Sequence, residues 1–246
     1  MNIKKQIPNA ITCCNLLCGC LAIVQSFEGN LVLAAYLVGL AAIFDFLDGF
    51  MARLLNVSSS IGKDLDSLAD MVTFGVVPGI MMFQLIKLSV VNYNADYCGD
   101  QLPDFYSYFK YFGFIITIFS AIRLAIFNND NRQSESFIGL PTPANAILIC
   151  SFPLVLEYGN CDFNLNPYLM SAISLVLSIL LISEIPLFAL KFKDLKWKGN
   201  EIRFVFLILS VLFLVTLQFV GIPLIIILYI VMSVVNNIIT KKKAFS

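Results

Sequence analysis

The sequence predicts an all-α protein, a polytopic membrane bundle of about eight transmembrane helices with both termini in the cytoplasm. Of its 246 residues, 59% are hydrophobic and only 13% are charged. The mean hydropathy of +0.86 lies far above the range of soluble domains. Apolar runs of about 20 residues, the length that crosses a bilayer, follow one another along the chain between short polar segments.

The first four helices are expected at residues 8–27, 31–54, 66–91 and 106–127. The first follows two lysines, as a signal peptide would. It is longer than the apolar part of a signal peptide, and no small-residue cleavage site follows it, so we expect it to be retained.

The remaining helices are expected at residues 143–156, 167–190, 202–220 and 223–239. The fifth of the eight is short and contains Pro153. The Gly-Ile-Pro sequence at residues 221–223 predicts a tight turn, so the last two helices should form a hairpin. We see no internal repeat or flexible linker, and the sequence therefore indicates one membrane domain over residues 1–246.

The distribution of charge indicates which loops lie in the cytoplasm, because lysine and arginine are enriched in cytoplasmic loops of membrane proteins. Basic residues lie at the amino terminus, in every second loop and in the tail, whereas the other loops carry mostly acids. Lys87 and Lys110 are exceptions. The cytoplasmic group comprises Lys4, Lys5, Arg53, Lys63, Arg123, Arg132, Lys191, Lys193, Lys196, Lys198, Arg203, Lys241, Lys242 and Lys243. Both the count of eight helices and the cytoplasmic termini follow from this alternation.

Several classes of site are excluded by composition. The chain has no histidine, so Ser-His-Asp triads and HExxH zinc sites are ruled out. Its net charge of zero gives no global attraction to nucleic acid. Four cysteines in the first apolar run are expected to pack as small apolar residues. Cys98 and Cys161 fall in loops expected outside the cell, where a disulfide could form.

Carboxylates are concentrated in residues 45–70, which read D-x2-D-G-x2-A-R-x8-G-x3-D-x3-D. Asp45 and Asp48 are three residues apart, and Asp66 and Asp70 four apart, so each pair projects from one helix face. Antiparallel neighbours would bring Asp48 near Asp66 and Asp45 near Asp70, close to the cytoplasmic surface. Such a group suits one or two divalent cations, which prefer oxygen ligands.

Other residues of this stretch admit two interpretations. Gly49 and Gly62 leave room for a substrate to approach the backbone, or they allow close helix packing. Arg53 could hold a phosphate, or it could simply mark the cytoplasmic side. The acids could be surface carboxylates at helix ends, although Asp45 lies too far inside its apolar run for that.

The pattern of residues 45–70 resembles the signature of the CDP-alcohol phosphatidyltransferase family at each of its eight specified positions. The resemblance implies a helical membrane enzyme, a homodimer, with its active site at the cytoplasmic face of the cell (inner) membrane. The enzyme would transfer a phosphatidyl group from a CDP-linked lipid to an alcohol and release CMP. Four aspartates, Asp45, Asp48, Asp66 and Asp70, would hold Mg²⁺ or Mn²⁺. Asp70 would also be the base, and Gly49, Ala52, Arg53 and Gly62 would bind the nucleotide and diphosphate.

Further segments in the first 150 or so residues are similar to the membrane-bound phosphatidylserine synthases of this family: PNAITCCNLLCG, RLAIFN and FIGLPTPAN. CDP-diacylglycerol and L-serine are therefore the expected substrates. Arg123 and Asn128 are candidates to bind the serine carboxylate or the donor phosphate. Arg123 could instead be a cytoplasmic-side arginine and Asn128 a helix cap. Residue Ile126 stands where many relatives would have a basic residue. The catalytic part should end near residue 157, with additional helices over 158–246.

The sequence is also compatible with other functions. The acceptor could be glycerol 3-phosphate, inositol or choline. A divalent-cation transporter would also place acids inside the membrane, but it should carry them in both halves of the chain. In the second half, only Glu184 is expected within a transmembrane helix, and it has no evident partner.

Overall fold

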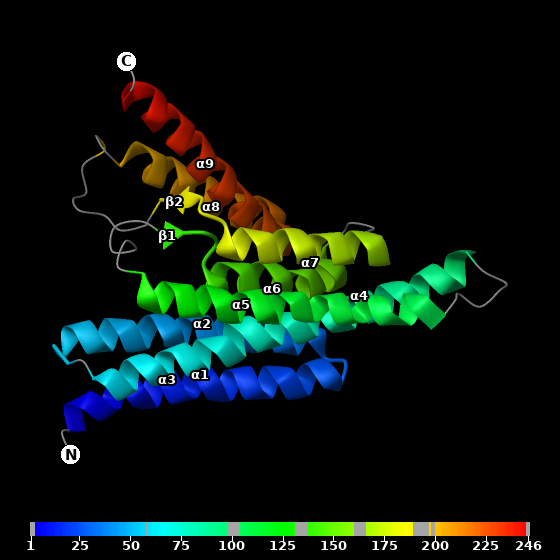
Figure 1. Cartoon of the computed structure of the whole chain (residues 1–246), viewed down its shortest axis with the longest axis horizontal. Coiled ribbons are helices and arrows are strands. Elements are labelled where there is room, and N and C mark those ends of the chain that lie inside the picture. Colours follow the sequence, from blue (N-terminus) through cyan, green and yellow to red (C-terminus); the bar gives the residue numbers. More distant parts are fainter. Residues whose placement is uncertain are drawn as a thin grey trace.

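The computed structural model describes residues 3–57, 59–97, 104–130, 137–159, 166–188, 197 and 200–244. Nearly all of these residues are helical, and most of the helices run along the long axis of the molecule (Figure 1). Helices α1 (Ile3–Phe27) and α2 (Leu31–Leu54) form an antiparallel pair, as predicted. The turn between them is made at Gly29, whose φ of 87° is readily adopted only by glycine.

The third predicted helix is one continuous rod with an irregularity in its middle. Helix α3 (Ser60–Asp70) leads into a π-helical turn, η1 (Met71–Val76), and then into α4 (Val77–Tyr97). The rod begins six residues earlier than residue 66 because the Ser59 hydroxyl caps it by accepting a hydrogen bond from the backbone N–H of Gly62, at 3.0 Å. The π turn directly follows Asp70, and such turns are frequent at functional sites.

The fourth predicted helix consists of a 3₁₀ segment, η2 (Asp104–Phe112), followed by α5 (Gly113–Asn129). Glycines allow α5 to approach α4 closely. A Cβ atom at Gly113 would lie 2.8 Å from the carbonyl oxygen of Gly79 and 2.5 Å from the nitrogen of Phe83. The fully buried side chains Phe74, Met81, Leu85 and Ile149 belong to the core around this contact.

Helix α6 (Thr142–Tyr158) matches the fifth predicted helix, but α7 (Pro167–Ile182) ends eight residues before the predicted end at residue 190. Hydropathy alone extended that helix across Pro186, which cannot continue a helix and which biases Ile185 toward an extended conformation. Strand β2 (Pro186–Leu187) follows instead and pairs antiparallel with β1 (Phe137–Ile138). The prediction that Glu184 lies within a transmembrane helix is therefore wrong: Glu184 is exposed in this connection.

The last two helices, α8 (Glu201–Leu217) and α9 (Gly221–Ala244), pack against each other as the predicted hairpin (Figure 1). The chain reverses at η4 (Gln218–Val220), where Gln218 has a φ of 48°. The Gly-Ile-Pro sequence thus starts α9 instead of forming the turn, with Pro223 in the first helical turn, where its missing N–H costs nothing.

Five stretches of helix among the described residues are long and apolar enough to cross a membrane: Gln6–Phe27, Leu31–Leu54, Ser60–Tyr93, Tyr108–Asn129 and Glu201–Ile239. Helices α6 and α7 are also apolar but have 17 and 16 residues. At 1.5 Å per residue they are roughly 25 Å long, a little less than the hydrocarbon core of a bilayer. Cys18 and Cys150 are buried as free thiols, whereas Cys98 and Cys161 lie outside the described residues.

Candidate active site

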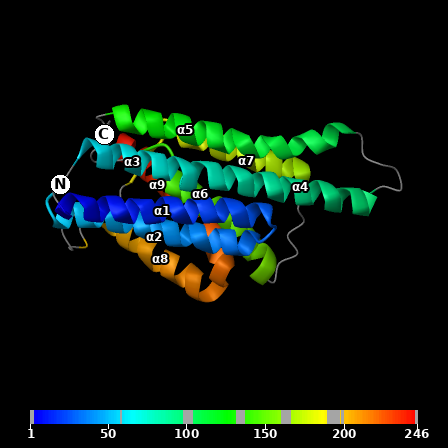
Figure 2. The same cartoon turned by 90° about the horizontal axis from the view of Figure 1, so that it is seen from below.

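Helices α1, α2 and α3 surround the acids of residues 45–70 at one end of the bundle. Helix α1 packs against both α2 and α3 (Figure 2). The chain turns between α2 and α3 at Asn56, which has a φ of 49°, and α3 then runs back along the bundle. The last turns of α2 and the first turns of α3 therefore face the same space beside α1.

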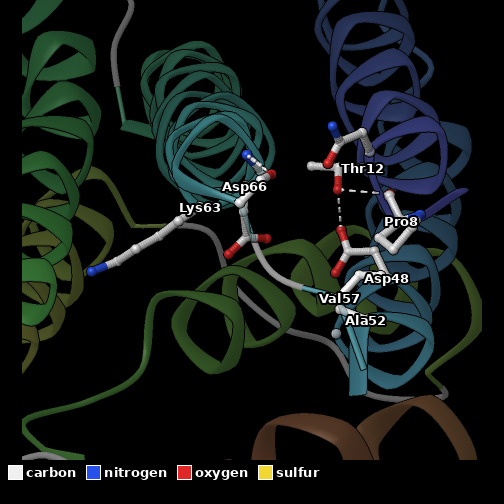
Figure 3. A pocket seen from close by; sticks show the side chains of 11 residues that line it. Pro8, Thr12, Asp48, Ala52, Val57, Lys63 and Asp66 are labelled. Atoms are coloured by element: carbon white, nitrogen blue, oxygen red, sulfur yellow. Dashed lines mark hydrogen bonds between the residues drawn. The ribbon is translucent and has the colours of Figure 1, made fainter. Parts of the chain in front are cut away.

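The carboxylates of Asp45, Asp48 and Asp66 form a cluster, with one oxygen from each lying within 4.8 Å of the others. Figure 3 shows the side chains of Asp48 and Asp66 directed into the same space, while Lys63 points away from them. Charged carboxylates this close repel each other by about 3 kcal/mol or more per pair at an effective dielectric constant of ~20. A divalent cation among them would remove this repulsion, and the all-oxygen ligand set fits Mg²⁺ or Mn²⁺.

The hydroxyl of Thr12 holds Asp48 in place. It lies 2.5 Å from Asp48 Oδ2, to which it donates, and 3.1 Å from the carbonyl oxygen of Pro8. Thr12 is 3% exposed and Asp48 is 6% exposed, so this hydrogen bond is shielded from water. A buried hydrogen bond to a ligand carboxylate fixes its orientation toward a metal.

Replacing Thr12 by valine should therefore weaken divalent-cation binding by about 10–100-fold, the usual cost of losing such a supporting contact. Titration of the purified protein with Mn²⁺, followed by electron paramagnetic resonance, measures this. The matched control is Thr12→Ser, which keeps the hydroxyl and should bind Mn²⁺ nearly as well as the parent. Equal affinity in the valine variant would show that Thr12 has no part in positioning Asp48.

A first pocket of about 250 Å³ opens beside the cluster, between α1, α2 and α3 (Figure 3). Gly49, Ala52 and Gly62 line it, as the sequence interpretation requires of nucleotide-site residues. A Cβ atom at Gly62 would lie 2.9 Å from Asn9 Oδ1 and from Ser59 Oγ, so a side chain there would disturb the pocket wall. Arg53 is exposed and is not among the lining residues. The full lining is Pro8, Asn9, Thr12, Asp48, Gly49, Ala52, Val57, Ser59, Gly62, Lys63 and Asp66.

A second pocket of about 190 Å³ lies on the other side of Asp66, which lines both pockets. It contains Asp70, Arg123 and Asn128, three residues that the sequence analysis assigned to catalysis or acceptor binding. The rest of its wall comes from Ser67 of α3, from α5, and from Pro141 and the start of α6. The complete lining is Asp66, Ser67, Asp70, Arg123, Leu124, Phe127, Asn128, Pro141, Thr142 and Pro143.

The polar side chains of the second pocket are held by neighbours. Arg123 is 3% exposed, and its guanidinium lies 5.3 Å from the centre of the Phe127 ring, a cation–π contact. Asn128 is exposed and donates a hydrogen bond to Ser67 Oγ at 2.9 Å. This contact joins the end of α5 to α3 across the mouth of the pocket.

Asp70 is not one of the three clustered acids, but it lies close enough for the charges of Asp45 and Asp66 to act on it. It lines the second pocket and accepts a hydrogen bond from Asn15 Nδ2 at 3.4 Å. Asn15 is fully buried, and its main-chain oxygen accepts a hydrogen bond from Thr73, so α1 is tied to Asp70 and to the π turn that follows it. The predicted neighbour of Asp70 was Asp45, and Asp45 is indeed the acid whose charge acts most strongly on Asp70. The structure adds Asp66 to this neighbourhood, because Asp45 also belongs to the cluster with Asp48 and Asp66.

Sequence reasoning did not single out Thr12, Asn15 or Thr142 as site residues. Thr12 and Asn15 are three residues apart in a largely apolar run, so they share one helix face. Two hydrogen-bonding side chains on one face of a membrane helix indicate an inward surface, and that signal was available in the sequence. The place of Thr142 depends on how α6 meets α5, which no local pattern gives.

Comparisons with known proteins agree with this geometry. Residues 5–183 match the family model described as CDP-alcohol phosphatidyltransferase. A CDP-diacylglycerol–serine O-phosphatidyltransferase of Helicobacter pylori is 34% identical over 216 residues, covering 86% of this chain and 83% of the relative. The enzyme of that name from Bacillus subtilis is 35% identical over 169 residues, covering 67% and 85%. An archaetidylserine synthase of Methanothermobacter thermautotrophicus is 30% identical over 193 residues, covering 75% and 72%.

Proposed function

The chain belongs to the CDP-alcohol phosphatidyltransferase family, and from this premise we propose that it transfers the phosphatidyl group of CDP-diacylglycerol to the hydroxyl of L-serine, giving phosphatidylserine and CMP. One observation carries the proposal. The three-carboxylate cluster lies between two pockets, one lined by the glycines of the family signature and the other by Arg123 and Asp70. A two-substrate transfer needs this arrangement, because donor and acceptor must meet at the same phosphorus.

The first pocket would take the nucleotide of the donor. Its small residues Gly49, Ala52 and Gly62 leave space for the cytidine group, and Arg53 lies outside the lining, where it could reach an entering phosphate. Asp45, Asp48 and Asp66, with Asp70 beside them, would hold one or two Mg²⁺ or Mn²⁺ ions, which would neutralise the diphosphate and stabilise CMP as the leaving group.

The second pocket would take serine. Arg123 can pair with the serine carboxylate, since a guanidinium binds carboxylates in a fixed two-point geometry. Asn128 can donate to the same group or to the donor phosphate. Asp70, at the wall of this pocket, can accept the proton of the serine hydroxyl as the oxygen attacks phosphorus.

The same proposal places the site at the cytoplasmic face of the inner membrane. Both chain termini and the α2–α3 connection lie at one end of the molecule (Figure 1). Lys4, Arg53 and Lys63 belong to that end, as expected for a cytoplasmic face. Counting α8 and α9 separately and including α6 and α7 gives the eight transmembrane helices. Both pockets use residues up to Pro143 only, in keeping with a catalytic part that ends near residue 157. A homodimer, implied by the family resemblance, completes the proposal.

The acceptor is tested by supplying the purified protein with CDP-diacylglycerol and one labelled alcohol at a time: serine, glycerol 3-phosphate, inositol or choline. We expect CMP release and a labelled lipid with serine, at a rate at least tenfold above any other alcohol. Labelled lipid from a different alcohol would identify that compound as the acceptor. CMP release that depends on an added alcohol also separates a transferase from a cation transporter, for which the exposed position of Glu184 removes the expected second acidic site.

A further inference from the structure

Asn145 is a buried amide that the proposed mechanism does not yet use. It lies in the first turn of α6 and is 0% exposed. Among the residues that the structure describes, neither Asn145 Nδ2 nor Asn145 Oδ1 has a hydrogen-bond partner. An amide buried in this way loses its hydrogen bonds to water and gains none from the protein. Buried polar groups are nearly always paired, so an unpaired amide indicates a polar ligand at that point.

The position of Asn145 on α6 points to the second pocket. Pro141, Thr142 and Pro143 line that pocket, and Asn145 follows Thr142 by three residues and Pro141 by four. Residues with these spacings share one face of a helix. Side chains on a helix lean toward its amino terminus, so the amide of Asn145 is directed toward the turn that forms the pocket wall. Asn145 is not itself a lining residue, and its amide therefore lies one layer behind Pro141, Thr142 and Pro143. Ten of the 17 residues of α6 are buried, so this wall belongs to the interior of the bundle.

We propose that Asn145 binds the amino-acid end of the acceptor, and this assignment rests on the proposed serine transfer. An amide offers both kinds of contact that a zwitterion needs: Nδ2 donates to the carboxylate and Oδ1 accepts from the ammonium group. Arg123 supplies the positive charge from the α5 side of the same pocket. Asn145 thus becomes a residue that determines which alcohol is accepted.

This assignment separates serine from the other candidate alcohols. Glycerol 3-phosphate has no ammonium group to donate to Oδ1, choline has a quaternary ammonium without N–H, and inositol has no charge. Choline, apart from its reacting hydroxyl, has no group that could pair with the amide, and sites with unpaired polar groups discriminate strongly against such analogues. Hydroxyl groups of inositol or glycerol 3-phosphate could pair with the amide, but neither compound carries the carboxylate and ammonium groups that Arg123 and Asn145 would bind together.

The test is the variant Asn145→Leu, which keeps the approximate volume and removes both polar atoms. The KM for serine should rise about 10–100-fold, the loss expected for one hydrogen bond to a charged group. The KM for CDP-diacylglycerol should stay within a factor of two. The thermal unfolding midpoint should be equal or higher, because an unpaired buried amide is removed. Asn145→Ala provides a second variant with the same expected rise, should leucine not fit.

The matched control is Ser151→Ala on the same helix. Ser151 is 1% exposed, but its hydroxyl is satisfied by the carbonyl oxygen of Leu148 at 2.6 Å, so its loss should leave the KM for serine unchanged. An unchanged KM for serine in a folded, active Asn145 variant would overturn this assignment and leave the proposed function intact. A parent protein that uses another alcohol and not serine would overturn both.

Discussion

Replacing Asp70 by asparagine should lower CMP release from CDP-diacylglycerol and serine by about 10²–10⁴-fold, the usual contribution of a general base. The amide has the shape of the carboxylate but cannot accept the proton of the serine hydroxyl. Asp70 lines the second pocket, where the acceptor would bind, and lies outside the three-carboxylate cluster. The loss should therefore appear mainly in kcat, with metal affinity changed less than turnover. Initial rates of CMP release, measured over a range of serine and Mg²⁺ concentrations, give both quantities.

A matched control for this variant is Asp64→Asn, which removes an exposed carboxylate of α3 that lines neither pocket. That variant should keep the activity of the parent. The Asp70 variant should also elute from size exclusion and unfold on heating like the parent, since its neighbour Asn15 can still form a hydrogen bond to an amide oxygen. Parent-like turnover in a folded Asp70→Asn protein would remove Asp70 from the mechanism as the base.

Removing divalent cations should have an equally large effect. Chelation with EDTA is expected to reduce CMP release to background, and added Mg²⁺ or Mn²⁺ should restore it, because the donor diphosphate cannot approach an uncompensated cluster of carboxylates. Asp48→Asn should raise the Mg²⁺ concentration needed for half-maximal rate by at least tenfold. The measurement is the rate of CMP release against free metal concentration.

The comparison that isolates this effect uses the same Asp64→Asn protein, whose metal requirement should equal that of the parent. Recovery of activity on adding metal back excludes irreversible damage by the chelator. Full turnover in a protein freed of metal would mean that the carboxylates act without a cation, and the account of Asp45, Asp48 and Asp66 as metal ligands would then fail.

Much of this fold could be predicted because membrane helices are encoded by local composition. Helix α2 was predicted at its observed bounds, since Asn30 and the polar segment after Leu54 limit an uninterrupted apolar run. The two pairs of aspartates could also be predicted to share a helix face, because residues three or four positions apart in a helix lie on the same face independently of tertiary contacts. The short connection between α2 and α3 makes the two helices antiparallel neighbours, so the two acidic faces could be predicted to meet.

Features that depend on contacts between distant segments could not be predicted in this way. The early end of α7 follows from Pro186, but a hydropathy profile does not take account of the N–H that proline lacks. The β1–β2 pairing joins residues about 50 positions apart, so no local pattern predicts it. The position of Asp45 close to Asp66 as well as to Asp70 depends on how α3 is placed beside α1 and α2. The buried state of Asn145 depends on the packing of α6 and has no local signal in the sequence.

The central claim is that α2 and α3 pool their carboxylates to bind divalent cations beside two substrate pockets. The most direct measurement is a crystal structure of the protein grown with Mn²⁺, with the ion located by its anomalous scattering. We predict a peak within bonding distance of oxygens from Asp45, Asp48 and Asp66, and its loss in Asp66→Asn crystals. A peak elsewhere in the protein, or none at this cluster at millimolar Mn²⁺, would contradict the account.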